Sequence, residues 1–157
     1  MRVITTDLPE VLIVEPKLFG DQRGFFLEMY QLGRYVEHGI PGSFVQDNLS
    51  RSGHGVLRGL HLQNPSTQGK LVSVLRGRVL DVSVDVRVGS PSFGLSDTAD
   101  FFYKCDNAYS PKDELVVRWD DPAIGIHWGL ENPSLAPRDA AAPLLAEVKN
   151  LPVYGQV

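Results

Sequence analysis

The sequence predicts an all-β protein in which short strands build a sandwich or a barrel. Glycine and proline are frequent, with 15 and 11 residues in a chain of 157. They divide the chain into short segments, as turns do in all-β folds. Many of these segments are short apolar or alternating runs of strand length. The length of the chain suits one domain, residues 1–157, with a substantial core.

Each expected element follows from such a run. Strands are expected at Val11–Val14, Phe25–Tyr30, Phe44–Asn48, Val56–Gln63, Ala99–Cys105 and Leu115–Trp119. Short helical turns are expected at Arg34–His38, which precedes a glycine, and in the tail Ala136–Val148. Pro143 has to start a helix of this tail or interrupt it.

The clearest period-2 pattern lies in the segment Val79–Arg87. Its apolar residues alternate with Asp81, Ser83 and Asp85, which predicts a strand with one buried and one polar side. The apolar run Leu71–Leu75 precedes it, so that a turn centred on Gly77 would make the two segments a hairpin.

Composition narrows the classes of partner. The net charge of −4 argues against nucleic acid as a general partner. No stretch approaches the roughly 18 apolar residues of a membrane span, and no apolar run of signal-peptide length begins the chain. Cys105 is the single cysteine, which suits a reducing compartment. We therefore expect a cytoplasmic protein.

A group of basic residues in the centre of the chain is either a solvated sheet face or a local anion site. Its members are Arg51, Arg58, Lys70, Arg76 and Arg78. The sequence has no Walker or dinucleotide pattern, so any phosphate must be held by side chains such as Arg23, Arg58 and Lys70.

His61 is the strongest catalytic candidate among the histidines, because it lies inside the apolar segment Val56–Gln63. An ionisable ring there needs either a partner or a purpose, and a satisfied core histidine is the other reading. Arg58 and Lys70 are close in sequence, and neighbouring cations would keep the ring neutral and able to accept a proton. In a regular strand Arg58 and His61 point to opposite faces, so a bulge at Gly59 is needed to bring them together.

Other side chains are weaker candidates for chemistry. The remaining histidines, His38, His54 and His127, suit surface or capping positions. No second histidine lies within five residues of His61, so a cupin-type metal site is disfavoured. Tyr103 is either a core aromatic or a general acid.

Many segments, in order along the chain, resemble the motifs of the dTDP-4-dehydrorhamnose 3,5-epimerase family. They are Phe19–Glu28 (FGDQRGFFLE), Phe44–Asn48 (FVQDN), Val56–Gln63 (VLRGLHLQ), Gln68–Val72 (QGKLV), Asp81–Gly94 (DVSVDVRVGSPSFG), Phe102–Lys104, Tyr109–Pro111, Trp119–Trp128 (WDDPAIGIHW), Arg138–Asp139 and Ala141–Leu145. The resemblance covers nearly the whole chain and implies a cupin-type jelly roll, usually a homodimer. It also implies epimerisation of dTDP-4-keto-6-deoxyglucose at C3, C5 or both, without a metal or another cofactor.

The resemblance also assigns roles to residues. His61 looks like the base that removes the proton beside the ketone, and Asp139 like the carboxylate that orients it. Tyr103 looks like the acid on the other face of the sugar, and Lys70 like the cation that stabilises the enolate oxygen. The positions that resemble the family's nucleotide and diphosphate site are Arg23, Phe26, Glu28, Gln46, Asn48 and Arg58.

One departure from the family pattern is large. Gly94 runs directly into Leu95–Ala99, where the family has roughly 25 to 30 further residues, enough for about two strands. That stretch contains a histidine that lines the family's site. Either the sequence lacks a segment that the whole enzyme has, or the protein is naturally shorter and its core is closed otherwise, for example by a partner subunit.

Smaller departures concern the outcome of the reaction. Ala108 stands before Tyr109, where the family often has two tyrosines, and Leu49 and Leu62 replace a usual histidine and a usual aromatic residue. An epimerase of C3 alone or C5 alone is therefore one alternative. A sugar-nucleotide-binding protein without catalysis is another.

Overall fold

The computed structural model describes residues 1–40, 42–91, 95–97 and 102–156. Within these residues, strands predominate and helices are short, which agrees with the predicted all-β class. The helical elements are α1 (Leu32–Val36), α2 (Pro137–Ala140) and the 3₁₀ turn Leu145–Glu147. The two segments predicted to contain helical turns therefore contain them, and Pro143 lies between α2 and the 3₁₀ turn.

The strands pair in antiparallel groups. β1 (Arg2–Thr5) pairs with β2 (Leu12–Glu15), and β3 (Leu18–Asp21) pairs with β4 (Gly24–Leu27). β8 (Val82–Val84) pairs with β9 (Leu95–Asp97), and β6 (His61–Gln63) pairs with β11 (Glu114–Val116). β10 (Tyr103–Cys105) lies between β5 (Gln46–Asn48) and β7 (Lys70–Val72).

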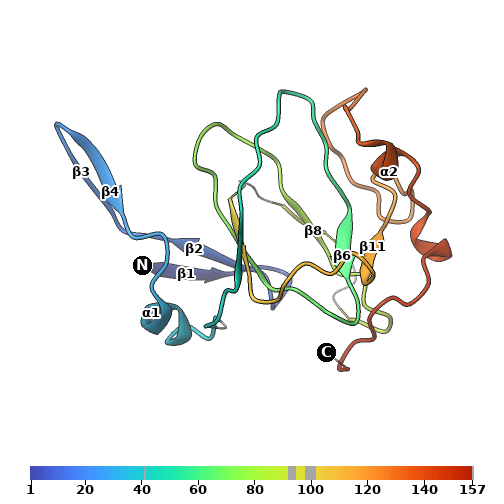
Figure 1. Ribbon diagram of the computed structural model, residues 1–157, viewed down its shortest axis with the longest axis horizontal. Coiled ribbons are helices and arrows are strands. Elements are labelled where there is room, and N and C mark those ends of the chain that lie inside the picture. Colours follow the sequence, from blue (N-terminus) through green and yellow to red (C-terminus); the bar gives the residue numbers. More distant parts are fainter. Residues whose placement is uncertain (41, 92–94, 98–101, 157) are drawn as a thin grey trace.

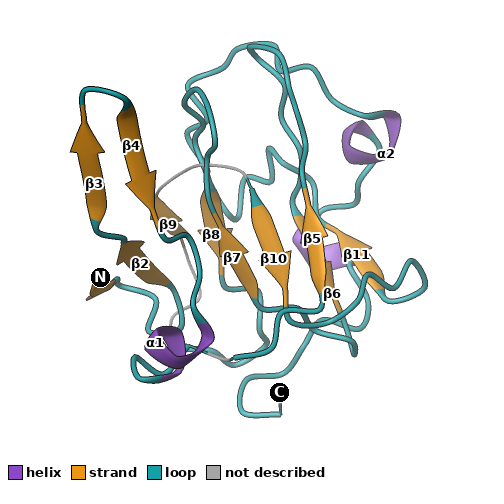
Figure 2. Ribbon diagram, turned by 60° about the vertical axis from the view of Figure 1, so that its left-hand side comes forward, coloured by secondary structure: helices purple, strands orange, loops and turns teal. Residues whose placement is uncertain are grey.

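The hairpin β3–β4 projects from one end of the molecule, and α2 lies at the other end (Figure 1). Figure 2 shows the same arrangement, with β7, β10 and β5 side by side in the body between these two ends. Large apolar side chains of the hairpin are exposed. They are Leu18, Phe19, Phe25 and Phe26.

The register of the three-stranded sheet places four of the predicted site residues on one face. Tyr103 lies opposite Asn48 on one side and Val72 on the other, and Cys105 lies opposite Gln46 and Lys70. Directly opposed residues of antiparallel strands project to the same face, and residues two apart on one strand share that face. Gln46, Asn48, Lys70 and Tyr103 therefore share one face.

The strand that carries His61 is shorter than predicted. Only His61–Gln63 of the expected strand Val56–Gln63 is strand. Gly59 has φ of 130°, a conformation that favours glycine and departs from a regular strand. The backbone between Arg58 and His61 is therefore not a regular strand. The rule that residues three apart on a strand point to opposite faces does not apply to these two residues.

The predicted hairpin around Gly77 is wrong. β7 pairs with β10, whereas β8 pairs with β9, so the two segments that flank Gly77 have different partners. The predicted burial of the apolar side of Val79–Arg87 is also not found, because Leu80 is 45% exposed and Asp85 only 8%. Asp85 tolerates burial because it accepts hydrogen bonds from Arg87 and Ser90.

Other boundaries differ by a few residues. β4 ends at Leu27, earlier than the predicted Tyr30, and β11 ends at Val116 rather than Trp119. Of the predicted strand Ala99–Cys105, residues 99–101 lie outside the described residues and the rest contains β10. Among the residues whose burial is described, the buried apolar ones are Leu8, Tyr35, Leu57, Cys105, Val117, Ala142 and Leu145. No helix of the described residues is long and apolar enough to cross a membrane.

Candidate functional site

His61 and Asp139 meet although 78 residues separate them in the sequence. His61 Nε2 lies 2.8 Å from Asp139 Oδ1. β6 presents the histidine and α2 presents the carboxylate, which also accepts a hydrogen bond from the Gly59 amide at 3.4 Å. The Asp139 side chain is 2% exposed and that of His61 27%. The pair therefore consists of a buried carboxylate and a ring that reaches the surface.

The environment of Asp139 keeps this carboxylate ionised. Burial acts to raise its pKa, but the hydrogen bond and charge of His61, the Gly59 amide and Arg138 outweigh burial, so that the pKa lies below its ordinary value. The ring makes no other hydrogen bond than those of Nε2 among the residues that the structure describes. Nδ1 is thus the nitrogen left for a proton from a ligand.

Arg138 is a third member of this cluster, which the sequence interpretation did not assign. Its Nη2 lies 3.0 Å from His61 Nε2, and its Nε lies 3.4 Å from Asp139 Oδ1. Nη1 donates a hydrogen bond to Glu114 Oε2, which also accepts the Tyr109 hydroxyl at 2.8 Å. The only signal in the sequence was that Arg138 adjoins Asp139 and matches a family motif with it.

The sheet β5–β10–β7 supplies polar groups on one face. Lys70 Nζ lies 5.7 Å from the centre of the Tyr103 ring, within the range of a cation–π contact. Burial is the main cause that raises the pKa of Tyr103, and the charges of Arg58 and Glu114 also act on it. The phenol is therefore kept protonated. Glu114, whose charge acts on its pKa, is the residue that accepts the hydrogen bond from Arg138.

The remaining polar residues of this face form a local network. Gln46 Nε2 donates to Asn48 Oδ1 at 3.0 Å, and Gln46 Oε1 accepts the Tyr109 amide at 2.8 Å. The Arg58 guanidinium donates to Ser52 Oγ at 3.1 Å. Gln46 and Tyr109 thus link the polar face of the three-stranded sheet to Glu114 and Arg138.

Three predicted residues lie elsewhere. Arg23 and Phe26 belong to the hairpin β3–β4, which projects from the molecule (Figure 1). Arg23 pairs with Asp21, and Phe26 is exposed. Glu28 follows the hairpin and accepts a hydrogen bond from Arg34 at 2.9 Å. Within one chain, the fold therefore does not bring Arg23 and Phe26 to His61.

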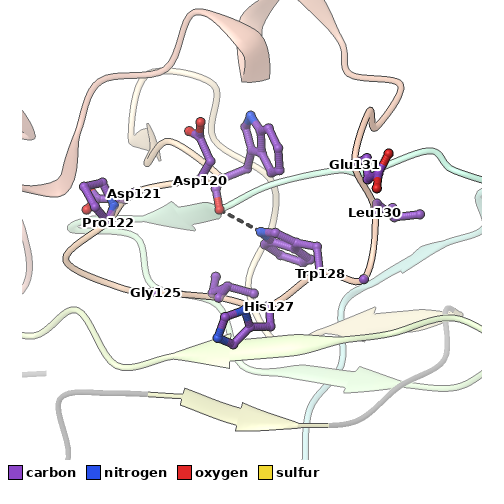
Figure 3. Close-up of a pocket in the computed structure, with 11 residues that line it drawn as sticks. Asp120, Asp121, Pro122, Gly125, His127, Trp128, Leu130 and Glu131 are labelled. Carbon is purple, nitrogen blue, oxygen red and sulfur yellow. Dashed lines mark hydrogen bonds between the residues drawn. The ribbon is translucent and has the colours of Figure 1, made fainter.

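A separate pocket of about 580 Å³ lies in the loop that follows β11, residues 119–131. Figure 3 shows His127 and Trp128 at this pocket, where the Trp128 indole donates to the Trp119 carbonyl at 2.8 Å. Asp121 of the same loop is buried and accepts the Leu145 amide at 2.6 Å. None of the predicted site residues lines this pocket. No group of three or more metal-ligating side chains occurs in the described part of the chain.

Comparison with known proteins gives a consistent result. The family model described as dTDP-4-dehydrorhamnose 3,5-epimerase matches residues 5–96 and 94–147. The dTDP-4-dehydrorhamnose 3,5-epimerase of Salmonella typhimurium strain LT2 is 45% identical over 92% of this chain and 96% of its own length. The enzyme of that name from Neisseria gonorrhoeae is 42% identical over 95% of this chain, and the chain spans 54% of its length.

A solved structure shows the same fold. The dTDP-6-deoxy-D-glucose-3,5-epimerase of Legionella pneumophila Philadelphia 1, in complex with dTDP-4-keto-L-rhamnose, is 43% identical to this chain. The match has a TM-score of 0.91 and covers 98% of each chain. The predicted cupin-type jelly roll is thereby confirmed at the level of the fold.

The expected missing stretch is also confirmed. The match to the Neisseria gonorrhoeae protein extends over 177 residues, more than the 157 of this chain. That relative therefore has residues without a counterpart here. The family model matches in two parts that meet at residues 94–96, which places the break directly after the motif that ends at Gly94.

Proposed function

Because the chain belongs to the dTDP-4-dehydrorhamnose 3,5-epimerase family, we propose that it inverts carbon centres beside the C4 ketone of a dTDP-4-keto-6-deoxy sugar. The observation that carries this proposal is the pair of His61 and the buried Asp139, 2.8 Å apart. A proton next to a ketone is weakly acidic, so its removal requires a base that works near neutral pH. A histidine held by an ionised carboxylate is such a base.

The proposed reaction begins when His61 takes the proton from C3 or C5. Asp139 orients the ring and stabilises the imidazolium that forms. The electrons of the broken C–H bond move to the ketone oxygen, and Lys70 stabilises the charge of the resulting enolate. Tyr103 then donates its phenolic proton to the same carbon from the opposite face; the enolate electrons form the new C–H bond, the ketone is restored and the centre is inverted. The raised pKa of Tyr103 means that the phenol still carries its proton when the enolate forms. Solvent returns a proton to the Tyr103 phenolate and takes one from the His61 imidazolium before the next turnover.

We assign the binding of the nucleotide and the diphosphate to side chains of two regions. Gln46, Asn48 and Arg58 belong to the body of the chain that carries the catalytic residues. Arg23, Phe26 and Glu28 lie on or directly after the projecting hairpin. A guanidinium suits the diphosphate and an exposed aromatic ring suits a base.

The position of the hairpin supports a homodimer. The hairpin β3–β4, which carries Arg23 and Phe26, lies away from β6 of the same chain (Figure 1). Its apolar side chains are exposed. A second copy that receives the hairpin would bury this surface and bring both residues to its own site. The measurement is the mass in solution by light scattering. A monomer at micromolar concentration would refute the dimer.

The location in the cell is also a proposal. The single cysteine, Cys105, is buried and free, as expected in a reducing compartment. We propose that the protein acts in the cytoplasm.

The reaction is tested by incubating the protein with dTDP-4-keto-6-deoxyglucose in heavy water and recording NMR spectra of the sugar. We expect deuterium at C3 and C5 and its loss in the variant His61→Ala. His54→Ala is the matched control, since His54 is exposed and is assigned no catalytic or binding role, and it should retain exchange. Exchange at one carbon would make the protein a single-centre epimerase. Binding of dTDP without exchange would refute catalysis by this chain and would point to the missing stretch.

A further inference from the structure

The guanidinium of Arg138 is placed to act on the pair of His61 and Asp139. It contacts both members, with Nη2 3.0 Å from His61 Nε2 and Nε 3.4 Å from Asp139 Oδ1. Glu114 fixes the other end of the group through Nη1. Since Glu114 belongs to β11 and lies on the same face as His61, the paired strands β6 and β11 hold the arrangement together.

Asp139 and Arg138 require opposite states of the same nitrogen. A neutral imidazole carries one proton, so Nε2 either donates to Asp139 or accepts from Arg138. If Nε2 accepts from Arg138, the proton is on Nδ1 and the ring cannot act as a base there. If Nε2 donates to Asp139, Nδ1 is free, and the guanidinium turns to Asp139 Oδ1, which its Nε already approaches.

The charges of Asp139 and Arg138 also have opposite effects on the His61 ring. Asp139 favours the imidazolium, whereas the permanently charged guanidinium disfavours it. The titratable and charged groups gathered around the ring are Arg138, Asp139 and Glu114, with Tyr109 bound to Glu114. Tyr103 of β10 and Arg58 lie in electrostatic reach of this group, because Arg58 and Glu114 both act on Tyr103.

We propose that Arg138 is a positioning residue for His61 and that its guanidinium competes with Asp139 for Nε2 and opposes the protonation that Asp139 favours. A catalytic role for this effect rests on the proposed function. The effect of Arg138 on the protonation of His61 does not depend on catalysis. The sequence pattern favours Arg58 and Lys70 for this effect, but in the described part of the chain the cation in contact with the ring is Arg138.

The test follows the protonation of His61 directly. The NMR signals of the imidazole carbons and protons are recorded against pH, and the His61 signal is identified by its loss in His61→Ala. We expect Arg138→Gln to raise the titration midpoint of His61 by about one pH unit, the lower end of the effect of a neighbouring charge, because the arginine is half exposed. Arg138→Lys should shift the midpoint less, since the charge remains. An unchanged or lowered midpoint in Arg138→Gln would overturn the proposal.

Two further variants separate this effect from a loss of structure. Arg118→Gln is the matched control, because Arg118 has a similar exposure and pairs with Asp120 outside the site, and it should leave the midpoint unchanged. Glu114→Gln removes the carboxylate that neutralises Arg138, so it should lower the midpoint. A raised or unchanged midpoint in Glu114→Gln would contradict the proposal even if Arg138→Gln failed to fold.

The kinetic consequence distinguishes this proposal from the proposed function. If the wild-type protein exchanges deuterium, the acid limb of its kcat/KM profile should move with the NMR midpoint in Arg138→Gln. If the wild-type protein shows no exchange, the proposed function fails while the NMR titration still decides the role of Arg138.

Discussion

Replacing Asp139 by asparagine removes the charge of the buried carboxylate while it preserves the size of the side chain. In the structure, His61 Nε2 is 2.8 Å from Asp139 Oδ1, and the Asp139 side chain is 2% exposed. When His61 accepts a proton from the sugar, this carboxylate stabilises the new positive charge. Asp139→Asn should therefore slow proton abstraction more than it weakens binding of dTDP.

The size of the effect follows from the geometry. Two unit charges about 4 Å apart, at an effective dielectric constant of about 20, attract each other by about 4 kcal/mol. Water at the partly exposed ring and the nearby guanidinium reduce this value, so about 2 to 4 kcal/mol is expected. These energies correspond to a decrease of about 30-fold to 1,000-fold in the rate of the chemical step.

The assay is the initial rate of deuterium entry at C3 and C5 in heavy water, measured at saturating substrate. Urea unfolding of the same variant shows whether the fold is retained, and Asp120→Asn is the control, because Asp120 pairs with Arg118 outside the site. The reasoning would be refuted if a folded Asp139→Asn protein exchanged at more than one third of the wild-type rate.

Three other changes test other parts of the structure. Tyr103→Phe removes the proposed acid, so formation of inverted product should fall by about 100-fold or more. Removal of the substrate proton on the His61 face should continue. An equal decrease in both rates would count against the role of Tyr103. Arg87→Met removes the hydrogen bonds that hold the pKa of the Asp85 carboxyl well below its ordinary value. A depressed folded-state pKa gives stability that is present above about pH 4 and is lost as the pH falls through the folded-state pKa. The variant should thus lose about 1 to 3 kcal/mol of unfolding free energy at pH 7 and much less at pH 2, as measured by urea unfolding; a loss independent of pH would speak against the ion pair. Gly69→Ala should destabilise the segment before β7, because an added Cβ would lie 2.5 Å from Asp106 Oδ2 and would displace the carboxylate that accepts the Gly69 amide; a melting temperature equal to that of the wild type would contradict this packing.

Local patterns predicted the elements whose partners are near in sequence. The apolar run Val11–Val14 overlaps β2, whose partner β1 is only a few residues away, and Arg34–His38 overlaps α1. The predicted hairpin around Gly77 failed because both of its segments have other partners, and strand pairing over long distances leaves no periodic signal.

Contacts between residues far apart in the sequence also limited the prediction of the site. Spacing cannot place Asp139 beside His61, since the contact depends on how α2 packs near β6. The pair was predicted only through the resemblance to a family. Arg138 was missed because an arginine beside an aspartate on a short helix is ordinary in a sequence, and its contact with His61 exists only in the folded chain.

The most direct test of the proposed chemistry is solvent exchange at the sugar, compared between the wild-type protein and His61→Ala. We predict that the wild type introduces deuterium beside the C4 ketone of dTDP-4-keto-6-deoxyglucose and that His61→Ala does not. Equal exchange by the two proteins would contradict the role of His61 as the base. No exchange by a wild-type protein that binds dTDP would contradict catalysis by this chain.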